Sequence, residues 1–133
     1  MNIDKIKLGK DKSVDLFSDI AKEAAEHIKS SKRNKSTQIR KFYDELLLWN
    51  NKVNVPSKTI QEREQKYEEL APFIKMLKAK VAYAEGREHI DNKFKNVFDK
   101  CIDEVHSFET LKDAKLFLEA VIAYSKLHEL KEY

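Results

Sequence analysis

Glycine and proline are almost missing from this chain, which holds only two of each in 133 residues. Glycine supplies the left-handed backbone of tight turns, and nucleotide-binding loops and nucleophile elbows need glycines at fixed spacing. No G-x-x-x-x-G-K, G-x-G-x-x-G or G-x-S-x-G sequence occurs. The sequence therefore excludes the usual phosphate-cradling loops and favours a helical protein.

Length and composition predict one soluble domain that needs no disulfide or metal to fold. A single domain of this size buries about two thirds of the surface that its unfolded chain would expose. Cys101 is the only cysteine, so no internal disulfide can form. No apolar run reaches membrane-spanning length, and Met1 to Lys12 is too charged for a signal peptide. We expect a cytoplasmic protein with a poorly ordered segment at 1–12, one domain at 13–133 and no membrane contact.

Apolar periodicity predicts an all-α bundle of about five helices. The third and fifth helices begin with the capping boxes Thr59-x-x-Glu62 and Thr110-x-x-Asp113. Pro72 cannot sit in a helix interior without strain, so we expect a kink or break near Leu70-Ala71, with Gly86 at the C-cap of the second half. The predicted helices cover residues 13–32, 36–53, 59–86, 88–105 and 110–129.

The fifth predicted helix is apolar on two sides. At about 100° per residue, one stripe holds Leu111, Ala114, Phe117, Leu118, Val121 and Ile122. A helix with a second apolar stripe is either central to the bundle or shared with another chain. The candidate interface residues are those of the second stripe, together with Leu48 on the otherwise polar side of the second helix: Leu48, Leu116, Ala120, Ala123 and Leu127.

Residue types that carry catalysis do not recur at useful spacing. The four histidines fall on separate segments without an H-x-x-x-H pair, which argues against a metal site. Cys101 lies in an apolar stripe and is interpreted as an inert buried thiol. Asp99 and Asp103 share a helix face with Lys95 and Lys100, which is typical of solvated salt bridges. We therefore expect no enzymatic activity and no cofactor.

Two stretches of the chain carry cations without any acid, although the net charge is only +3. The first runs from Lys29 to Lys41 and joins a helix end, a connector and a helix start. Cations at a helix N-terminus oppose the helix dipole unless an anion binds there, so this cluster favours phosphate binding. A charged loop kept for solubility is the alternative. The second stretch runs from Ala71 to Ala84 and holds Lys75, Lys78 and Lys80.

One helical stripe in the second stretch combines cations with an aromatic ring. Met76, Lys80, Tyr83 and Arg87 follow the spacing i, i+4, i+7 and i+11. Such a stripe can bind phosphates and stack on a base or ribose. Tyr83 taken alone fits the edge of the core better, but the neighbouring cations favour the RNA-binding interpretation.

These residues carry a resemblance to a known family. The segment Thr37-Gln38-Ile39-Arg40-Lys41-Phe42-Tyr43, followed by Leu77-Lys78-Ala79-Lys80-Val81-Ala82-Tyr83-Ala84-Glu85-Gly86-Arg87, resembles the helical small subunit of type III-A CRISPR effectors, the Csm complex. The stretch from Asp113 to Tyr124 is similar to the last helix of that family. The order, the spacing and the chain length agree, over about residues 36–124.

The resemblance implies a non-catalytic subunit that lines up in several copies along guide RNA and captured target RNA in antiviral defence. Its implied partners are those RNAs, the backbone and large Csm subunits, and further copies of itself. Sequence recognition would be left to base pairing, while the protein holds phosphates and sugars. The candidate RNA-binding residues come from the two motifs, and three more join them on charge alone: Gln38, Arg40, Lys41, Lys78, Lys80, Tyr83 and Arg87, then Lys32, Arg33 and Lys35.

Two other classes of function stay open on the residues alone. A regulator with a helix-turn-helix is disfavoured because no helix pair has the short glycine-containing turn that positions a recognition helix. A protein-only adaptor would use the fifth helix as its working surface, with the basic stretches merely solvated. Salt-dependent RNA binding separates the adaptor from the RNA-binding classes.

Overall fold

The computed structural model describes residues 1–131 as an all-helical bundle, which confirms the predicted fold class. No strand occurs in this range, and the last two residues of the expected domain 13–133 lie outside it. A π-helical turn, Leu16–Ile20, leads directly into the first α-helix. The α-helices are α1 (Ala21–Lys29), α2 (Ser36–Val53), α3 (Ile60–Lys75), α4 (Leu77–Gly86), α5 (Asn92–Asp103) and α6 (Phe108–Lys131).

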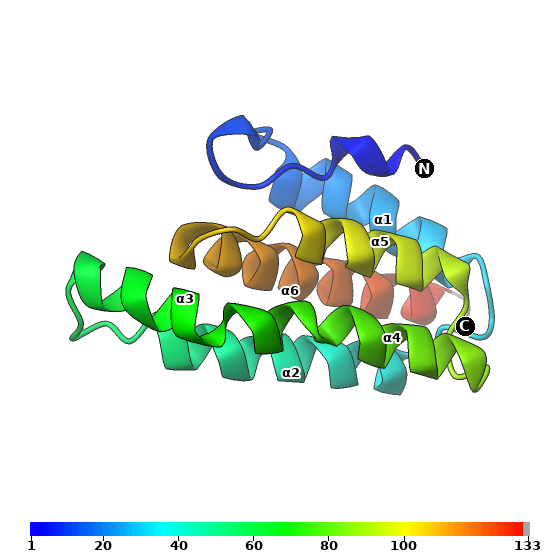
Figure 1. The fold of residues 1–133 in the computed structure, drawn as a ribbon. Coiled ribbons are helices and arrows are strands. Elements are labelled where there is room, and N and C mark those ends of the chain that lie inside the picture. The colour runs from blue at the N-terminus through cyan, green and yellow to red at the C-terminus, as the bar shows by residue number, and fades with distance from the viewer. Residues whose placement is uncertain (132–133) are drawn as a thin grey trace.

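Helix α6 lies in the middle of the bundle, between α1 on one side and α2 on the other (Figure 1). Its first stripe is buried except for the half-buried Ile122, and Leu111, Ala114 and Phe117 are fully shielded from solvent. Helix α3 turns back along α2, α4 continues in the same direction, and α5 packs on α4 (Figure 1). The α2 start and the α6 end therefore meet at one end of the bundle.

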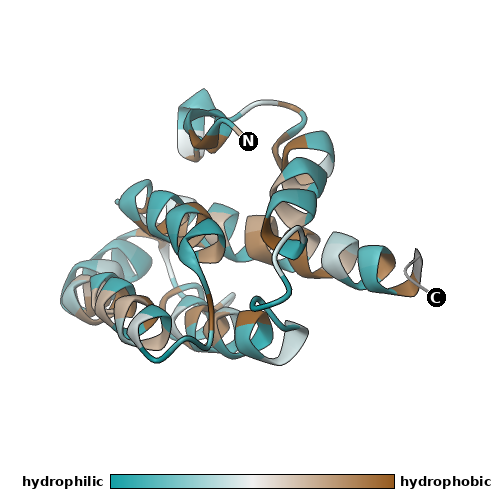
Figure 2. Ribbon diagram, turned by 90° about the vertical axis from the view of Figure 1, so that its right-hand side faces the viewer, coloured by the Kyte–Doolittle hydropathy of each residue, from teal (hydrophilic) through white to brown (hydrophobic). Residues whose placement is uncertain are grey.

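An aromatic cluster joins α2 to α5 at the centre of the core. Phe94 is fully buried, and its ring centroid lies 5.8 Å from that of Phe42 and 5.7 Å from that of Phe98. Apolar residues elsewhere on α2 repeat every three or four positions, as the sequence predicts for a face turned to the core. Hydropathy colouring shows the apolar ribbon segments gathered mainly toward the bundle interior (Figure 2).

The interruption after Pro72 falls at Met76, later than the expected break near Leu70-Ala71. Pro72 is accommodated inside α3, and its carbonyl accepts the Met76 N–H at 3.1 Å. The Met76 carbonyl then accepts the N–H groups of both Ala79 and Lys80, and its bond to Ala79 is of the 3₁₀ type. Helices α3 and α4 are thus one helix with a local defect, and the bundle has the expected five helices over residues 1–131.

Two helix ends differ from the sequence expectation. Gly86 is the last residue of α4, and the left-handed residue that ends the turn is Glu88, with φ of 62°. Helix α5 begins only at Asn92, because Asp91 caps it by accepting the Lys93 N–H at 2.9 Å.

Helix α6 begins two residues before the expected capping residue Thr110. Ser107 Oγ accepts the Thr110 N–H at 3.1 Å, and Thr110 Oγ1 accepts the Ser107 N–H at 2.9 Å. The reciprocal box is therefore Ser107 with Thr110. The Asp113 carboxylate instead accepts the Gly9 N–H at 2.9 Å and pairs with Lys12 at 3.4 Å.

That Asp113 contact ties down the segment for which the sequence predicts little order. Residues 1–12 contain two short 3₁₀ turns, Ile3–Lys5 and Gly9–Asp11. Ile6 is fully buried and Leu8 is 4% exposed. The structure therefore places residues 1–12 against the bundle, because two apolar side chains and the Gly9 hydrogen bond fix their path.

Candidate nucleic-acid interface

The connector between α1 and α2 is anchored by a buried asparagine, and its cations are exposed. Asn34 is fully buried, and its Nδ2 donates to the Ile28 carbonyl at 3.1 Å and to Asp91 Oδ1 at 2.5 Å. Its Oδ1 accepts the Asp91 N–H at 2.9 Å. Sequence reasoning missed this anchor, because a lone asparagine in a polar loop carries no pattern. Three exposed cations of the predicted set, with no ion pair to any residue from 1 to 131, surround it: Lys32, Arg33 and Lys35.

Lys29 belongs to the same stretch but is a structural residue. Its side chain is 10% exposed, and its Nζ donates to Glu129 Oε1 at 2.7 Å and to the Asn34 carbonyl at 3.1 Å. The Ser36 hydroxyl also donates to Glu129. Hydrogen bonds from Lys29 and Ser36 lower the pKa of the Glu129 carboxyl. This clamp fixes the end of α6 against the start of α2.

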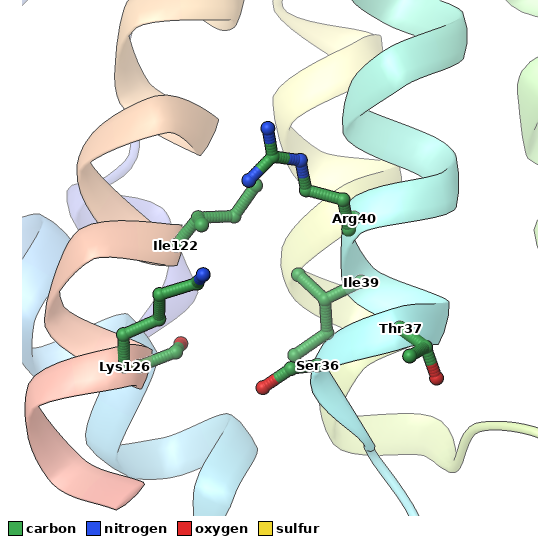
Figure 3. A pocket seen from close by; sticks show the side chains of 7 residues that line it. Ser36, Thr37, Ile39, Arg40, Ile122 and Lys126 are labelled. Atoms are coloured by element: carbon green, nitrogen blue, oxygen red, sulfur yellow. The ribbon is translucent and has the colours of Figure 1, made fainter. Parts of the chain in front are cut away.

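A cavity of about 240 Å³ opens between the two helices beside this clamp, and we call it the α2–α6 cleft. Ile39 and Ile122 form apolar walls, while Arg40 on α2 and Lys126 on α6 extend into the opening (Figure 3). The cleft is lined by Ser36, Thr37, Ile39, Arg40, Ile122, Ser125 and Lys126.

A second hollow adjoins the cleft and brings further cations to it. Lys32 and Lys35 line this hollow together with Lys126, which the cleft and the hollow share. Sequence reasoning missed Lys126, since it lies about ninety positions from Lys35 and only the fold brings the two together. Arg40 pairs with Asp44 at 3.6 Å, but both side chains are more than half exposed, so the pair is weak and open to exchange for a phosphate.

The other side of α2 forms a second surface, the α2–α4 face, defined by Lys41, Glu45, Lys80, Tyr83 and Arg87. Lys80 Nζ lies 3.4 Å from Glu45 Oε1 and so joins α4 to α2. Lys41 is exposed and precedes Glu45 by one helical turn, so it faces the same side. Tyr83 is 66% exposed, and Arg87 Nη1 donates to its hydroxyl at 2.9 Å. The predicted stripe of α4 is therefore a surface stripe.

Two of the predicted RNA-binding residues have other surroundings. Lys78 Nζ lies 2.5 Å from Asp103 Oδ1 on α5, away from the α2–α4 face. Gln38 is half-buried, and its Oε1 is buried without a hydrogen-bond partner among the described residues. Lys78 and Lys80, two cations of the acid-free stretch from Ala71 to Ala84, therefore lie in different environments.

An aromatic platform continues the α2–α4 face beyond Glu45. Trp49 and Phe73 stack with ring centroids 5.9 Å apart and planes 19° from parallel, and Lys52 Nζ lies 5.0 Å above the Trp49 ring. Phe73 and Met76 are each 49% exposed. The sequence alone does not reveal this platform, because the spacing of Trp49 and Phe73 suits the core, and an apolar side chain at core spacing cannot be distinguished from one at the rim.

The predicted interface residues lie on two separate surfaces. Leu48 is 50% exposed on the outer side of α2. On α6, Leu116 and Ala120 are half-buried, whereas Ala123 and Leu127 are exposed. The second stripe is thus partly used by the bundle itself and opens to solvent toward the end of α6.

Within residues 1–131 no group of three or more metal-ligating side chains could hold an ion, and no helix there is long and apolar enough to cross a membrane. Cys101 is fully buried, and burial raises the pKa of its thiol. The thiol is therefore inert, as its place in the apolar stripe predicts.

Residues 1–131 form helices, with exposed cations on two sides of α2 and exposed apolar side chains elsewhere. These features are typical of a helical binding or assembly subunit. The family described as Csm2 Type III-A matches residues 11–131, and this chain belongs to that family. It is a small structural subunit of the type III-A CRISPR complex and assembles with other Csm subunits. The match includes α1, which lies outside the motifs that carry the sequence resemblance. Comparisons with curated proteins and with solved structures gave no significant match.

Proposed function

We propose that this Csm subunit binds the backbone of guide RNA and target RNA, without catalytic activity of its own, in the cytoplasm. One observation carries the proposal: the fold gathers Lys32, Lys35 and Lys126 around one hollow that opens beside Arg40. Among residues 1–131, the one carboxylate that lines this hollow, Glu129, is already engaged by Lys29 and Ser36. A concentration of unpaired cations costs stability unless an anion binds, so it fits a polyanionic partner.

The α2–α4 face supplies the second part of the proposed RNA contact. Lys41, Lys80 and Arg87 offer cations, and the exposed Tyr83 ring offers a stacking surface. Both surfaces flank the N-terminal half of α2, so one RNA strand crossing this half can contact both. Because such contacts reach phosphates and sugars, base pairing between the RNAs retains the sequence information.

We expect the purified protein to bind single-stranded RNA weakly, with little sequence preference and strong salt dependence. Each phosphate contact adds about 0.7 to the slope of log affinity against log salt. Fluorescence anisotropy of labelled 20-nucleotide RNAs over a salt series measures that slope. Lys35→Gln and Lys126→Gln should each lower the slope by about one contact.

Lys66→Gln is the matched control for this measurement. Lys66 is an exposed cation paired with Glu69 in α3, away from both surfaces, so removing it changes net charge equally without removing a contact. A slope that falls as much for this control would show a general charge effect and refute the site. RNA binding that is absent at low salt would favour the protein-only adaptor.

We propose that copies of the subunit also contact one another through exposed apolar residues. Leu48→Glu or Ala123→Glu should weaken self-association, or incorporation with other Csm subunits, because either change places a charge in an apolar contact. Both positions are exposed, so circular dichroism should stay unchanged. Sedimentation velocity compares them with Ala82→Glu, which adds the same charge at an exposed alanine of α4. Equal behaviour of all three variants would exclude both positions from the contact.

A further inference from the structure

The α2–α6 cleft differs from the rest of the basic surface because its walls are apolar. Ile39 and Ile122 face each other across it, and the charged residues that line it within the described range 1–131 are the cations Arg40 and Lys126. Figure 3 shows the Arg40 guanidinium and the Lys126 ammonium both extending over the opening. A ligand that complements this arrangement has a flat apolar part and an anionic part.

Ser125 provides an independent sign that the cleft has an occupant. Its side chain lines the cleft and the residue is only 2% exposed, yet its Oγ has no hydrogen-bond partner among the described residues. A buried hydroxyl without a partner is destabilising, and such groups are rare in folded proteins. A ligand with a hydrogen-bonding edge would remove that destabilisation.

We infer that the α2–α6 cleft takes one unstacked nucleotide of a single-stranded RNA. The base lies between Ile39 and Ile122 with its edge toward Ser125 Oγ, and its phosphate lies at the Arg40 and Lys126 side chains. The inference rests on the proposed RNA binding and adds to it a base-holding subsite.

Size and charge select a nucleotide among possible occupants. The cavity of about 240 Å³ is smaller than the range of about 300–1,000 Å³ that drug-sized ligands occupy, so it admits a group the size of a single base. A base between apolar side chains keeps its hydrogen-bonding edge free for a hydroxyl such as that of Ser125. Bases inside a duplex are stacked and cannot enter, so the cleft requires an unpaired or splayed position.

The test compares two single-stranded 12-nucleotide RNAs with equal phosphate number, one fully base-bearing and one with abasic positions throughout its centre. Wild-type protein should bind the base-bearing RNA about fivefold or more tightly, since stacking one base contributes about 1–3 kcal/mol. A 2-aminopurine at the centre of the base-bearing RNA should change its fluorescence on binding. Ser125→Ala removes the hydrogen bond to the base edge, so it should lower this preference and leave binding of the abasic RNA unchanged.

Thr37→Ala is the matched control, because it also removes a hydroxyl from a cleft-lining residue. Figure 3 shows the Thr37 side chain turned away from the opening, so this variant should keep the full preference. Thermal melting separates binding from folding: Ser125→Ala removes an unpaired buried hydroxyl and should not lower the melting midpoint.

Four outcomes would overturn the inference. Equal affinity for both RNAs, with strong salt dependence, would leave backbone binding intact and remove the base subsite. A preference that survives Ser125→Ala unchanged would place the base elsewhere, with Tyr83 and the Trp49 platform as the next surfaces. No binding of either RNA would refute the proposed function itself. If Ser125→Ala instead impaired co-purification with other Csm subunits while both RNAs bound equally, the cleft would belong to a protein neighbour.

Discussion

Replacing Phe94 with alanine should lower the free energy of unfolding by about 3–5 kcal/mol, because the ring leaves a cavity that its neighbours cannot fill. Phe94 is fully buried and contacts the rings of Phe42 and Phe98. Its removal therefore takes a packing partner from both of these rings. Urea denaturation followed by circular dichroism at 222 nm measures the change. The loss is a large fraction of the stability of a domain of this size.

Tyr83→Ala is the aromatic control for this experiment. Tyr83 is 66% exposed and its hydroxyl meets only the Arg87 guanidinium, so its removal should change stability by less than about 0.5 kcal/mol. RNA binding should weaken in this variant, whereas Phe94→Ala should weaken it only as far as the protein unfolds. A large loss of stability for Tyr83→Ala would make the ring part of the core edge and remove it from the α2–α4 face.

The helices follow from the sequence because their apolar periodicity and their caps agree. The box Thr59-x-x-Glu62 is formed as predicted, with the Glu62 N–H donating to Thr59 Oγ1 at 3.1 Å. The equally good match at Thr110 failed, because Ser107 lies three residues earlier and pairs reciprocally with Thr110. The sequence offers two overlapping caps, Ser107 with Thr110 and Thr110 with Asp113. It does not show which one forms, because the Asp113 carboxylate binds the Gly9 N–H only in the folded protein.

The position of residues 1–12 against the bundle was not predictable for a related reason. Lysines and aspartates make up half of this segment, and its apolar side chains, Met1, Ile3, Ile6 and Leu8, are too few to show a sustained helical periodicity. Their burial depends on packing of the segment against α5 and α6, where the Glu104 side chain accepts the Leu8 N–H and the Asp113 side chain accepts the Gly9 N–H. Only the tertiary fold brings these acceptors to the chain.

The sequence groups the candidate RNA-binding residues by stretch, but it does not reveal the different surroundings that the fold gives them. A stretch free of acids in the sequence says nothing about acids that neighbouring helices bring. Lys75, Lys78 and Lys80 lie within six positions, yet Lys78 meets Asp103 of α5 and Lys80 meets Glu45 of α2. Their directions follow from the helical angle of about 100° per residue, but their partners follow from how α4 packs.

Lys75→Met should lower the free energy of unfolding by about 2–3 kcal/mol, although lysines on helices usually contribute little. Lys75 Nζ donates to the carbonyls of Ile102, near the end of α5, and of Val105, just after that helix, each at 2.7 Å. Methionine keeps the apolar stem and removes both hydrogen bonds, so the partly buried Val105 carbonyl loses its lysine donor, while the Ile102 carbonyl still accepts the Val105 N–H at 3.1 Å. Burial lowers the pKa of Lys75, so the hydrogen bonds rather than a favourable charge account for the effect.

Lys80→Met, made five positions away in the same stretch, should produce the opposite pattern. Its exposed pair with Glu45 contributes little to folding, so stability should change by less than about 0.5 kcal/mol while RNA binding falls. Urea denaturation and RNA anisotropy on both variants give four values that separate the two roles. If Lys75→Met instead kept full stability and lost RNA binding as Lys80→Met does, the carbonyls of Ile102 and Val105 would not need the lysine. The whole stretch would then act as one phosphate-binding strip, because its cations would share a single role despite their different neighbours.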